Sequence, residues 1–188
     1  MSWKLPESLL VGDSTFRIRT DFRDILTIFE AYNDPDLPID AKTYVMMNII
    51  YPDYETIPAE LMQEAAEKAV DFINMGQEDD DRKKPQLMDW QQDADILIPA
   101  INKVAGCEVR AVDHLHWWTF MGYYMEIGES LFSQVVGIRY KRAHGKKLEQ
   151  WEKDFEKDNK HIVRLKKRLT AEEQAERDEF LKAIGELV

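Results

Sequence analysis

Few residues of this chain are of the kinds that carry covalent chemistry or cradle phosphate. Cys107 is its single cysteine, so neither an internal disulfide nor a zinc site of several cysteines can form. The eight glycines are scattered singly, which argues against a glycine-rich loop around a phosphate. Motifs such as G-x-S-x-G and H-E-x-x-H are missing as well. We therefore expect no enzymatic activity, no catalytic residue and no cofactor.

Long apolar runs are also missing. No stretch approaches the roughly eighteen uninterrupted apolar residues of a membrane-spanning helix. The N-terminal segment MSWKLPESLLVGDST lacks a basic start followed by an apolar run and a small-residue cleavage site. We expect a protein that neither spans a membrane nor carries a standard export signal. The single cysteine fits a reducing cytoplasm.

Positive charge is scarce and unevenly spread. The chain has 25 Lys and Arg against 36 Asp and Glu, a formal net charge of -11, which argues against a general attraction to nucleic acid or anionic lipid. Residues 1–140 carry 12 basic and 25 acidic side chains, whereas residues 141–170 carry 11 and 5. The basic segment 141–168 keeps a nucleic-acid-binding alternative open. Glutamates at three- and four-residue spacing within it favour intrahelical ion pairs instead.

The apolar residues that are present predict a mainly helical fold. They make up 44% of the chain, enough to bury a core. Two short apolar stretches in residues 8–19, separated by turn-forming residues, predict a β-hairpin. Further along, apolar residues recur at three- and four-residue spacing and predict seven or eight helices. The expected fold is a compact multi-helix bundle, with a helical core and the hairpin in 1–140 and a charged helical extension in 141–188.

Side chains that can cap helices predict where several helices begin. Asp21, or the threonine before it, should cap the first helix, Asp40 the second and Asp113 the helix richest in aromatic residues. Near the C-terminus, Thr170 and Glu173 have the spacing of a capping box.

A proline interrupts the helix predicted from Met88 to Gly106. Pro99 lies inside it, and an interior proline removes one backbone hydrogen bond at a cost of about 3 kcal/mol. We expect a kink near residues 95–99 or two shorter helices. Residues 77–86, just before this helix, contain no apolar side chain and are the best candidate for a mobile loop.

The aromatic residues concentrate in DHLHWWTFMGYYMEI, residues 113–127. Its rings and methionines surround a helix on every side, so its first expected role is to form the centre of the core. A chain this small cannot cover all of these rings. We expect whichever of Trp117 or Tyr124 stays exposed to anchor a protein partner, with Trp151 as a third candidate.

Two groups of possible metal ligands have the wrong spacing for a shared ion. His114 and His116 would point about 200° apart on a helix, so we expect one to be exposed, the other to pack, and no metal to bind. Asp89 and Asp93 share a helical face that Asp95 does not. We interpret these carboxylates as solvated, or as partners of an arginine, the candidates being Arg110 and Arg139.

Several short motifs occur together along the chain. TDFR lies at residues 20–23, D-W-x-x-D-A-D-I-L-I-x-A-I at 89–101, LHWW at 115–118 and GIRY at 137–140. In this combination the chain resembles the phage gene-product-fifteen family, small tail-region proteins of long-tailed phages of Gram-positive hosts. The similarity spans roughly residues 5–155. Pro99 departs from the alanine-rich helix expected at that point.

The resemblance implies a phage or prophage tail morphogenesis protein that acts in the host bacterial cytoplasm through a protein partner. Family members are usually encoded just before the tape measure protein, where tail assembly chaperones are found. We therefore expect a chaperone that shields the tape measure protein, or a factor for another tail protein. Two alternatives stay open: a structural tail component retained in the virion, and a nucleic-acid-binding factor that uses residues 141–168.

The motif residues themselves are expected to have structural roles. We interpret Asp21 as a cap that joins the hairpin to the bundle, and we expect Arg23 to pair with a carboxylate of the 89–95 segment. His116, Trp118 and Arg139 are the other motif residues to which we assign structural roles.

Overall fold

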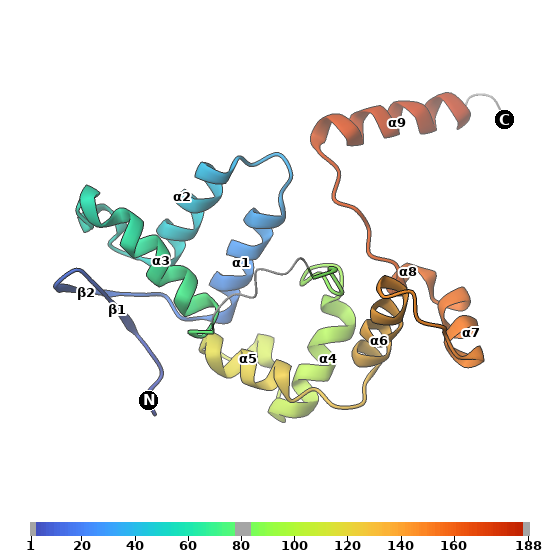
Figure 1. The fold of residues 1–188 in the computed structure, drawn as a ribbon, viewed down its shortest axis with the longest axis horizontal. Coiled ribbons are helices and arrows are strands. Elements are labelled where there is room, and N and C mark those ends of the chain that lie inside the picture. Colours follow the sequence, from blue (N-terminus) through green and yellow to red (C-terminus); the bar gives the residue numbers. More distant parts are fainter. Residues whose placement is uncertain (1–2, 78–83, 186–188) are drawn as a thin grey trace.

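The computed structural model describes residues 3–77 and 84–185 and shows helices following one small hairpin (Figure 1). The nine α-helices of the described residues are α1 Phe22–Asn33, α2 Ile39–Ile50, α3 Met62–Ile73, α4 Ala94–Ala105, α5 Trp117–Met125, α6 Leu131–Ala143, α7 Gln150–Asp158, α8 Lys160–Val163 and α9 Ala171–Gly185. Three short 3₁₀ helices join them: η1 Tyr54–Thr56, η2 Ala59–Leu61 and η3 Val109–Ala111. The mainly α class is confirmed. The helix count exceeds the expected one because the charged segment after α6 divides into α7 and α8 at Asn159.

The N-terminal hairpin is also confirmed. β1 (Ser8–Val11) pairs antiparallel with β2 (Ser14–Arg17). Gly12 takes a positive φ of 56° in the turn, which glycine adopts readily. Its backbone N–H donates to the Glu64 carboxylate of α3 at 3.0 Å, and a Cβ at Gly12 would lie 3.1 Å from Leu61. The turn therefore rests directly on α3.

The aromatic helix α5 lies at the centre of the main core, as its composition predicts. Phe120 is fully buried and stacks on Phe22 of α1 at 4.4 Å between ring centroids. Trp117 stacks on Phe120 at 5.9 Å, and its indole N–H donates to the Ile73 carbonyl of α3 at 2.8 Å. One helix thus contacts α1 and α3 through rings whose polar atoms are satisfied.

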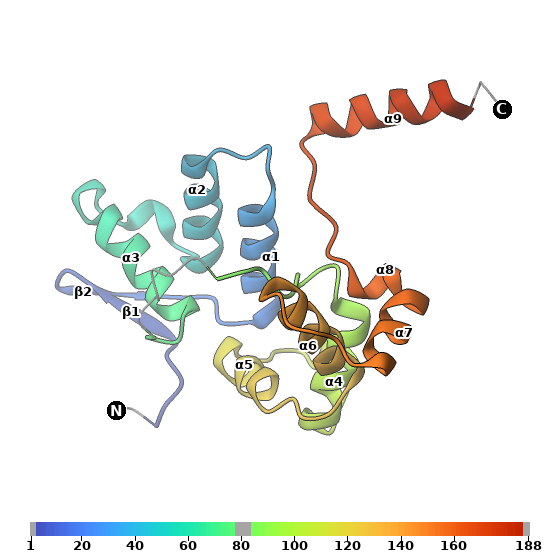
Figure 2. The same ribbon diagram turned by 45° about the vertical axis from the view of Figure 1, so that its right-hand side comes forward.

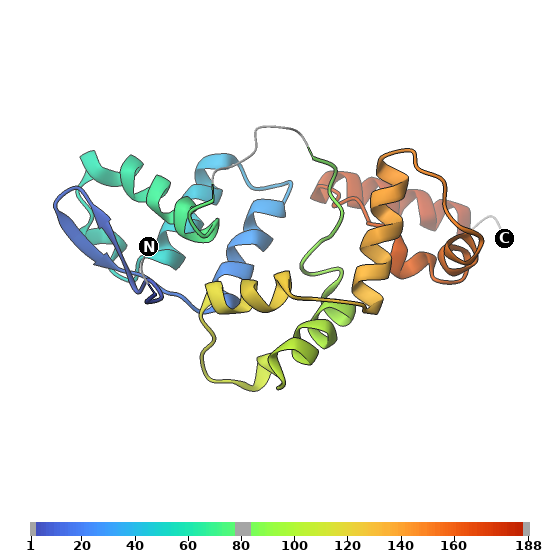
Figure 3. The ribbon, with the colours of Figure 1, turned by 60° about the horizontal axis from the view of Figure 1, so that its bottom comes forward.

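A second, smaller apolar cluster holds the helices after residue 130 together. It consists of Val135 and Ile138 of α6, Leu148, and Val163 of α8. Helices α6 to α8, which carry most of this cluster, and the hairpin lie on opposite sides of the molecule (Figures 1 and 3). The boundary predicted between residues 140 and 141 falls inside α6, so the change in charge does not coincide with the end of an element. Helix α9 stands away from the other helices, at the end of an extended connector, residues 164–170 (Figures 1 and 2).

Some predicted helix starts are right and others wrong. Asp21 caps α1 by accepting from the Arg23 N–H, and Thr170 and Glu173 form the predicted capping box, with N···O distances of 3.0 and 3.1 Å. Asp40 does not cap α2, because Pro38 occupies the N-cap position and Asp40 lies in the first turn. Asp113 does not cap α5 either, since that helix begins four residues later, at Trp117.

Helix α4 begins later than its periodicity suggests. Asp89 accepts hydrogen bonds from the backbone N–H groups of Gln91 and Gln92 at 3.0 and 2.8 Å, which holds the chain in a turn before the helix. From Ala94, α4 is continuous through Pro99 to the left-handed Gly106, so the alternative of two shorter helices is wrong. The kink near 95–99 stays a prediction.

Two further expectations concern a mobile loop and membrane-spanning helices. The proposed mobile loop at 77–86 lies mostly outside the described residues. Within residues 3–77 and 84–185, no helix has the length and apolar character needed to cross a membrane.

Candidate functional site

Two of the motifs, about ninety residues apart in the sequence, meet at one joint. An isolated antiparallel bridge pairs Asp21 of TDFR with His116 of LHWW. Main-chain hydrogen bonds flank it, from Phe22 N–H to the Leu115 carbonyl at 3.0 Å and from Trp117 N–H to the Thr20 carbonyl at 2.6 Å. The segments that start α1 and α5 are therefore held side by side.

Asp21 has more partners at this joint than a cap requires. Its carboxylate accepts from the Arg23 backbone N–H at 3.0 Å, from the Arg23 guanidinium at 2.9 Å and from the Leu115 N–H at 2.9 Å. The expected pairing of Arg23 with the 89–95 segment is wrong. The Arg23 guanidinium instead donates to the Val112 carbonyl at 2.6 Å as well, because the chain before α5 runs beside the start of α1.

The two histidines do not share a ligand-binding position. His116 is buried; its Nδ1 accepts from the Trp118 N–H at 3.0 Å, which leaves Nε2 to donate to the Pro6 carbonyl at 3.0 Å. His114 is exposed, with Nε2 3.1 Å from the Thr20 hydroxyl. The expectation of one packed and one exposed ring is confirmed, although both precede α5. In the described part of the chain, no three His, Cys, Asp or Glu side chains gather as a metal site would require.

Trp118, the remaining ring of LHWW, ties α5 to α3. Its indole N–H donates to the Phe72 carbonyl at 2.8 Å, and its ring stacks on Phe72 at 6.1 Å.

A second joint connects the D-W-x-x-D-A-D motif with GIRY through a buried ion pair. Arg139 and Asp93 are 6% and 1% exposed, and their two N···O distances are 2.7 and 2.8 Å. The guanidinium also donates to three backbone carbonyls, those of Leu87, Ile162 and Val163. All five of its N–H groups are therefore used. Of the alternatives that the sequence left open for Asp93, pairing with Arg139 is confirmed, whereas Arg110 pairs with Glu108.

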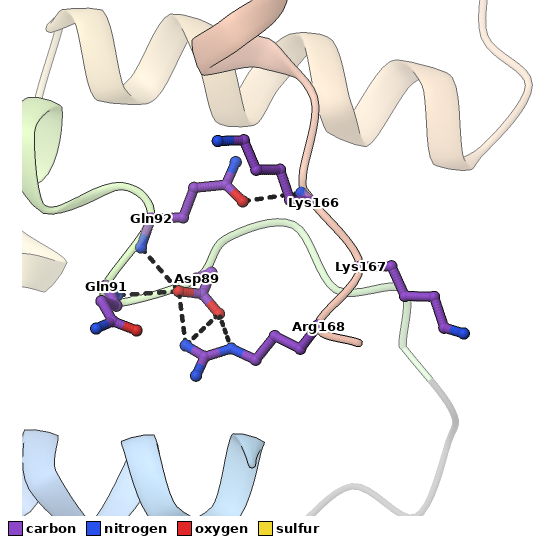
Figure 4. Close-up of a pocket in the computed structure, with 6 residues that line it drawn as sticks. All are labelled: Asp89, Gln91, Gln92, Lys166, Lys167 and Arg168. Atoms are coloured by element: carbon purple, nitrogen blue, oxygen red, sulfur yellow. Dashed lines mark hydrogen bonds and ion pairs between the residues drawn. The ribbon is translucent and has the colours of Figure 1, made fainter. Parts of the chain in front are cut away.

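Beside this pair, Asp89 attaches the connector to the body of the protein (Figure 4). Its carboxylate binds the Arg168 guanidinium at 3.0 Å, while the Gln92 amide accepts from Lys166 N–H and donates to the Arg164 carbonyl, both at 2.8 Å. Burial by itself would raise the pKa of Asp89, but the backbone N–H of Gln92 and the Arg168 guanidinium outweigh it and lower the pKa.

A hollow of about 310 Å³ lies at this attachment, lined by Asp89, Gln91, Gln92, Lys166, Lys167 and Arg168. Lys167 points away from Asp89 in Figure 4, and its ammonium pairs with Glu173 at 2.8 Å. The Arg168 guanidinium is engaged in its ion pair with Asp89. The polar groups here hold the connector in place.

Several cations of the basic segment 141–168 are neutralised by carboxylates. Lys141 pairs with Glu152 at 2.7 Å and Arg142 pairs with Glu156, which links α6 to α7. The pairs run between helices and not within one, contrary to the intrahelical expectation. The hydrogen bond from Lys141 lowers the pKa of Glu152. Cations engaged in this way are less available to phosphates, which weakens the nucleic-acid alternative.

The three residues expected to anchor a partner differ in exposure. Trp117 is 1% exposed, so it is not available on the surface; Phe29 of α1 and Trp90, which precedes α4, pack against its ring, and its indole N–H bonds to α3. Tyr124 is half-buried, and its hydroxyl lies 3.2 Å from the sulfur of Met88. Trp151 on α7 is 55% exposed and remains a candidate anchor.

The sequence did not indicate a groove between α2 and α3. It has a volume of about 340 Å³ and is lined by Asp40, Thr43, Tyr44, Met47, Tyr54, Met62, Gln63 and Ala66. Tyr44 is 59% exposed and packs edge-on against Tyr54 at 5.8 Å between ring centroids. The sequence feature that could have indicated the groove is the breadth of the apolar surface of α2. This surface is wider than one buried face needs, and Ile39 is exposed as well.

The chain was compared with known proteins, and no curated protein and no solved structure matches it. A family model described as Bacteriophage Gp15 protein matches residues 1–165. The match includes both joints, the groove and all of the short motifs. The chain therefore belongs to the Bacteriophage Gp15 protein family, a family of phage proteins.

Proposed function

We propose that this phage protein is a tail morphogenesis factor, and specifically a tail assembly chaperone that shields the tape measure protein in the host bacterial cytoplasm. The observation that carries the proposal is apolar surface left exposed on a strongly acidic member of a phage protein family. The partner in this role is a polypeptide. The chain itself performs no catalysis.

The exposed apolar side chains are large and lie on several elements. They include Ile39 and Tyr44 of α2 and Trp151 of α7. Large exposed apolar side chains of this kind are available to contact a protein partner. The formal net charge of -11 opposes self-association, so a chain with this surface can stay dispersed while it covers the apolar helices of a partner.

A binding role also agrees with how the buried polar groups are used. In the described part of the chain, every buried side-chain nitrogen and oxygen has a hydrogen-bond partner. Arg139, Asp93 and His116 are engaged with other groups of the protein itself. These groups stabilise the two joints and are not aimed at a substrate.

Co-expression tests the proposal. The tape measure protein of the same phage or prophage should be more soluble, and should co-purify, when it is produced together with this chain. A matched control is another tail protein of that phage, whose solubility should not change. If the tape measure protein shows neither effect, the chaperone role is wrong.

Mass spectrometry of purified virions separates a chaperone from a structural component. A chaperone should be absent from mature particles. Its presence at a stoichiometry comparable to that of other tail proteins would show that it is a virion component.

A further inference from the structure

The groove between α2 and α3 has a shape, a rigidity and a charge that together specify an occupant. We infer that it binds one amphipathic helix of the partner, with an apolar ridge flanked by Lys and Arg. This inference rests on the proposed function in taking the tape measure protein as the source of that helix.

The lining of the groove fits an apolar ridge. Met62 and Ala66, together with the largely buried Met47, form its apolar lining, and Tyr44 and Tyr54 add two rings with polar tips. Methionine side chains adapt to different apolar partners, and the small Ala66 leaves space between the helices. A volume of about 340 Å³ is at the small end of the ~300–1,000 Å³ typical of ligand pockets. It suits a few side chains of a helix laid in a groove.

The helices that form the groove are held in a fixed relation. The Tyr51 hydroxyl at the end of α2 donates to the Ala65 carbonyl of α3 at 2.8 Å, and both residues are buried. On α3, Glu64 is held by the Gly12 N–H of the hairpin turn. A groove whose walls are already fixed loses little conformational entropy when a partner enters.

The acidic residues around the groove favour an occupant with basic residues beside its apolar ridge. Residues 39–73, which include both helices, contain seven acidic side chains and two basic side chains, Lys42 and Lys68. The Lys42 ammonium donates to the Tyr32 carbonyl at 2.9 Å. Asp40 lines the groove, and Glu67 accepts from the lining residue Gln63 at 2.9 Å. A helix with flanking cations is attracted to this site, whereas one with flanking carboxylates is repelled.

A pair of designed peptides tests the groove directly. The probe is a fluorescein-labelled amphipathic Leu/Lys helix of about 18 residues, roughly 27 Å long, and its counterpart carries Glu in place of Lys. Fluorescence anisotropy should show that the full chain binds the Lys peptide, more weakly at high salt, and does not bind the Glu peptide. Equal binding of both peptides, or of neither, would overturn the inference.

Matched variants separate the groove from a general attraction to acidic surface. Tyr44→Ala should weaken binding of the Lys peptide by about tenfold or more. Met125→Ala removes an equally exposed apolar side chain from α5 and should change binding less than about twofold. The double variant Asp40→Asn/Glu67→Gln should weaken binding more than Glu126→Gln/Glu129→Gln, which removes the same charge from exposed positions beyond α5. If the groove variants and their controls behave alike, the groove is not the binding site.

The same variants distinguish failure of this inference from failure of the proposed function. If the tape measure protein binds the wild-type chain and Tyr44→Ala equally, the function stands and the groove assignment falls. If the Lys peptide requires Tyr44 but the tape measure protein does not bind at all, the groove assignment stands and the function falls. Light scattering that shows a wild-type dimer and a Tyr44→Ala monomer would identify a second copy as the occupant and overturn the inference.

Discussion

Replacing Arg139 with methionine should be among the most destabilising single changes in the protein. The guanidinium bonds to Asp93 at the start of α4 and to the backbone before α4 and at the end of α8, so one side chain of α6 links three segments. Methionine keeps an unbranched apolar stem but provides no donor. The variant would leave the Asp93 carboxylate, 1% exposed, with one remaining hydrogen bond, from the Asp89 N–H.

The expected loss follows from that burial. Breaking a buried ion pair by removing one partner costs about 3–5 kcal/mol, because a charge remains buried without compensation. Three backbone carbonyls lose a donor as well. For a chain of this length each kcal/mol corresponds to roughly 2–4 °C, so the melting temperature should fall by about 6–20 °C. A loss of about 3–5 kcal/mol is a large share of the ~5–15 kcal/mol by which a typical domain is stable.

Urea unfolding monitored by tryptophan fluorescence measures this loss of stability, since Trp90 lies within the segment from Asp89 to Asp93. Arg142→Met is the matched control, because Arg142 is also on α6 but its ion pair with Glu156 is exposed. Its free energy of unfolding should hardly change. Asp93→Asn completes a double-mutant cycle in which the double variant should lose about 0.5–3 kcal/mol less than the sum of the single losses.

Two results would refute this reasoning. One is a loss below about 1 kcal/mol for Arg139→Met, which would mean that water reaches the carboxylate. The other is a pair of single losses that simply add, which would mean that the two charges do not depend on each other.

Three further predictions concern the other contacts. Asp21→Ala should lower the free energy of unfolding by about 0.5–2 kcal/mol or more, since it removes a helix cap together with the Leu115 contact, and an unchanged melting temperature would exclude this role. The lowered pKa of Asp89 makes its contribution present above about pH 4 and lost as the pH falls further. Asp89→Asn should therefore lose less stability than wild type between pH 7 and pH 3 in urea titrations, and an equal loss would contradict the attachment. Tyr51→Phe should cost about 0.5–1.5 kcal/mol in the same assay at pH 7. Burial raises the pKa of the Tyr51 phenol, so wild type should lose stability above about pH 10 that Tyr51→Phe retains, and parallel pH curves would count against the buried hydrogen bond.

Helix caps show where local sequence signals suffice and where they fail. Asp21 was predicted as a cap because its partner, the Arg23 N–H, is two residues away. Asp113 had a suitable side chain for the same role, yet His116 caps α5. The bridge between Asp21 and His116 determines where α5 begins, and that contact joins segments about ninety residues apart.

The candidate site shows the same contrast between what local sequence signals indicate and what long-range contacts decide. From sequence, Asp93 could be solvated or paired with Arg110 or Arg139, and only the packing of α6 against the start of α4 selected Arg139. The groove could not be predicted, because the exposure of Tyr44 depends on how α3 crosses α2, and no local pattern encodes that crossing. Sequence left open whether Trp117 or Tyr124 stays exposed; Trp117 is buried because Phe29 and Trp90, both distant in sequence, pack against its ring.

Composition, turn residues and the spacing of apolar side chains were enough to predict the mainly helical class, the hairpin and most of the helices, because these signals act within one or two turns of chain. Tertiary structure alone decided which side of each amphipathic helix stayed uncovered and which cation met which carboxylate. Burial and ion pairing depend on atoms brought together from distant parts of the chain, so their outcome is settled only when the helices pack.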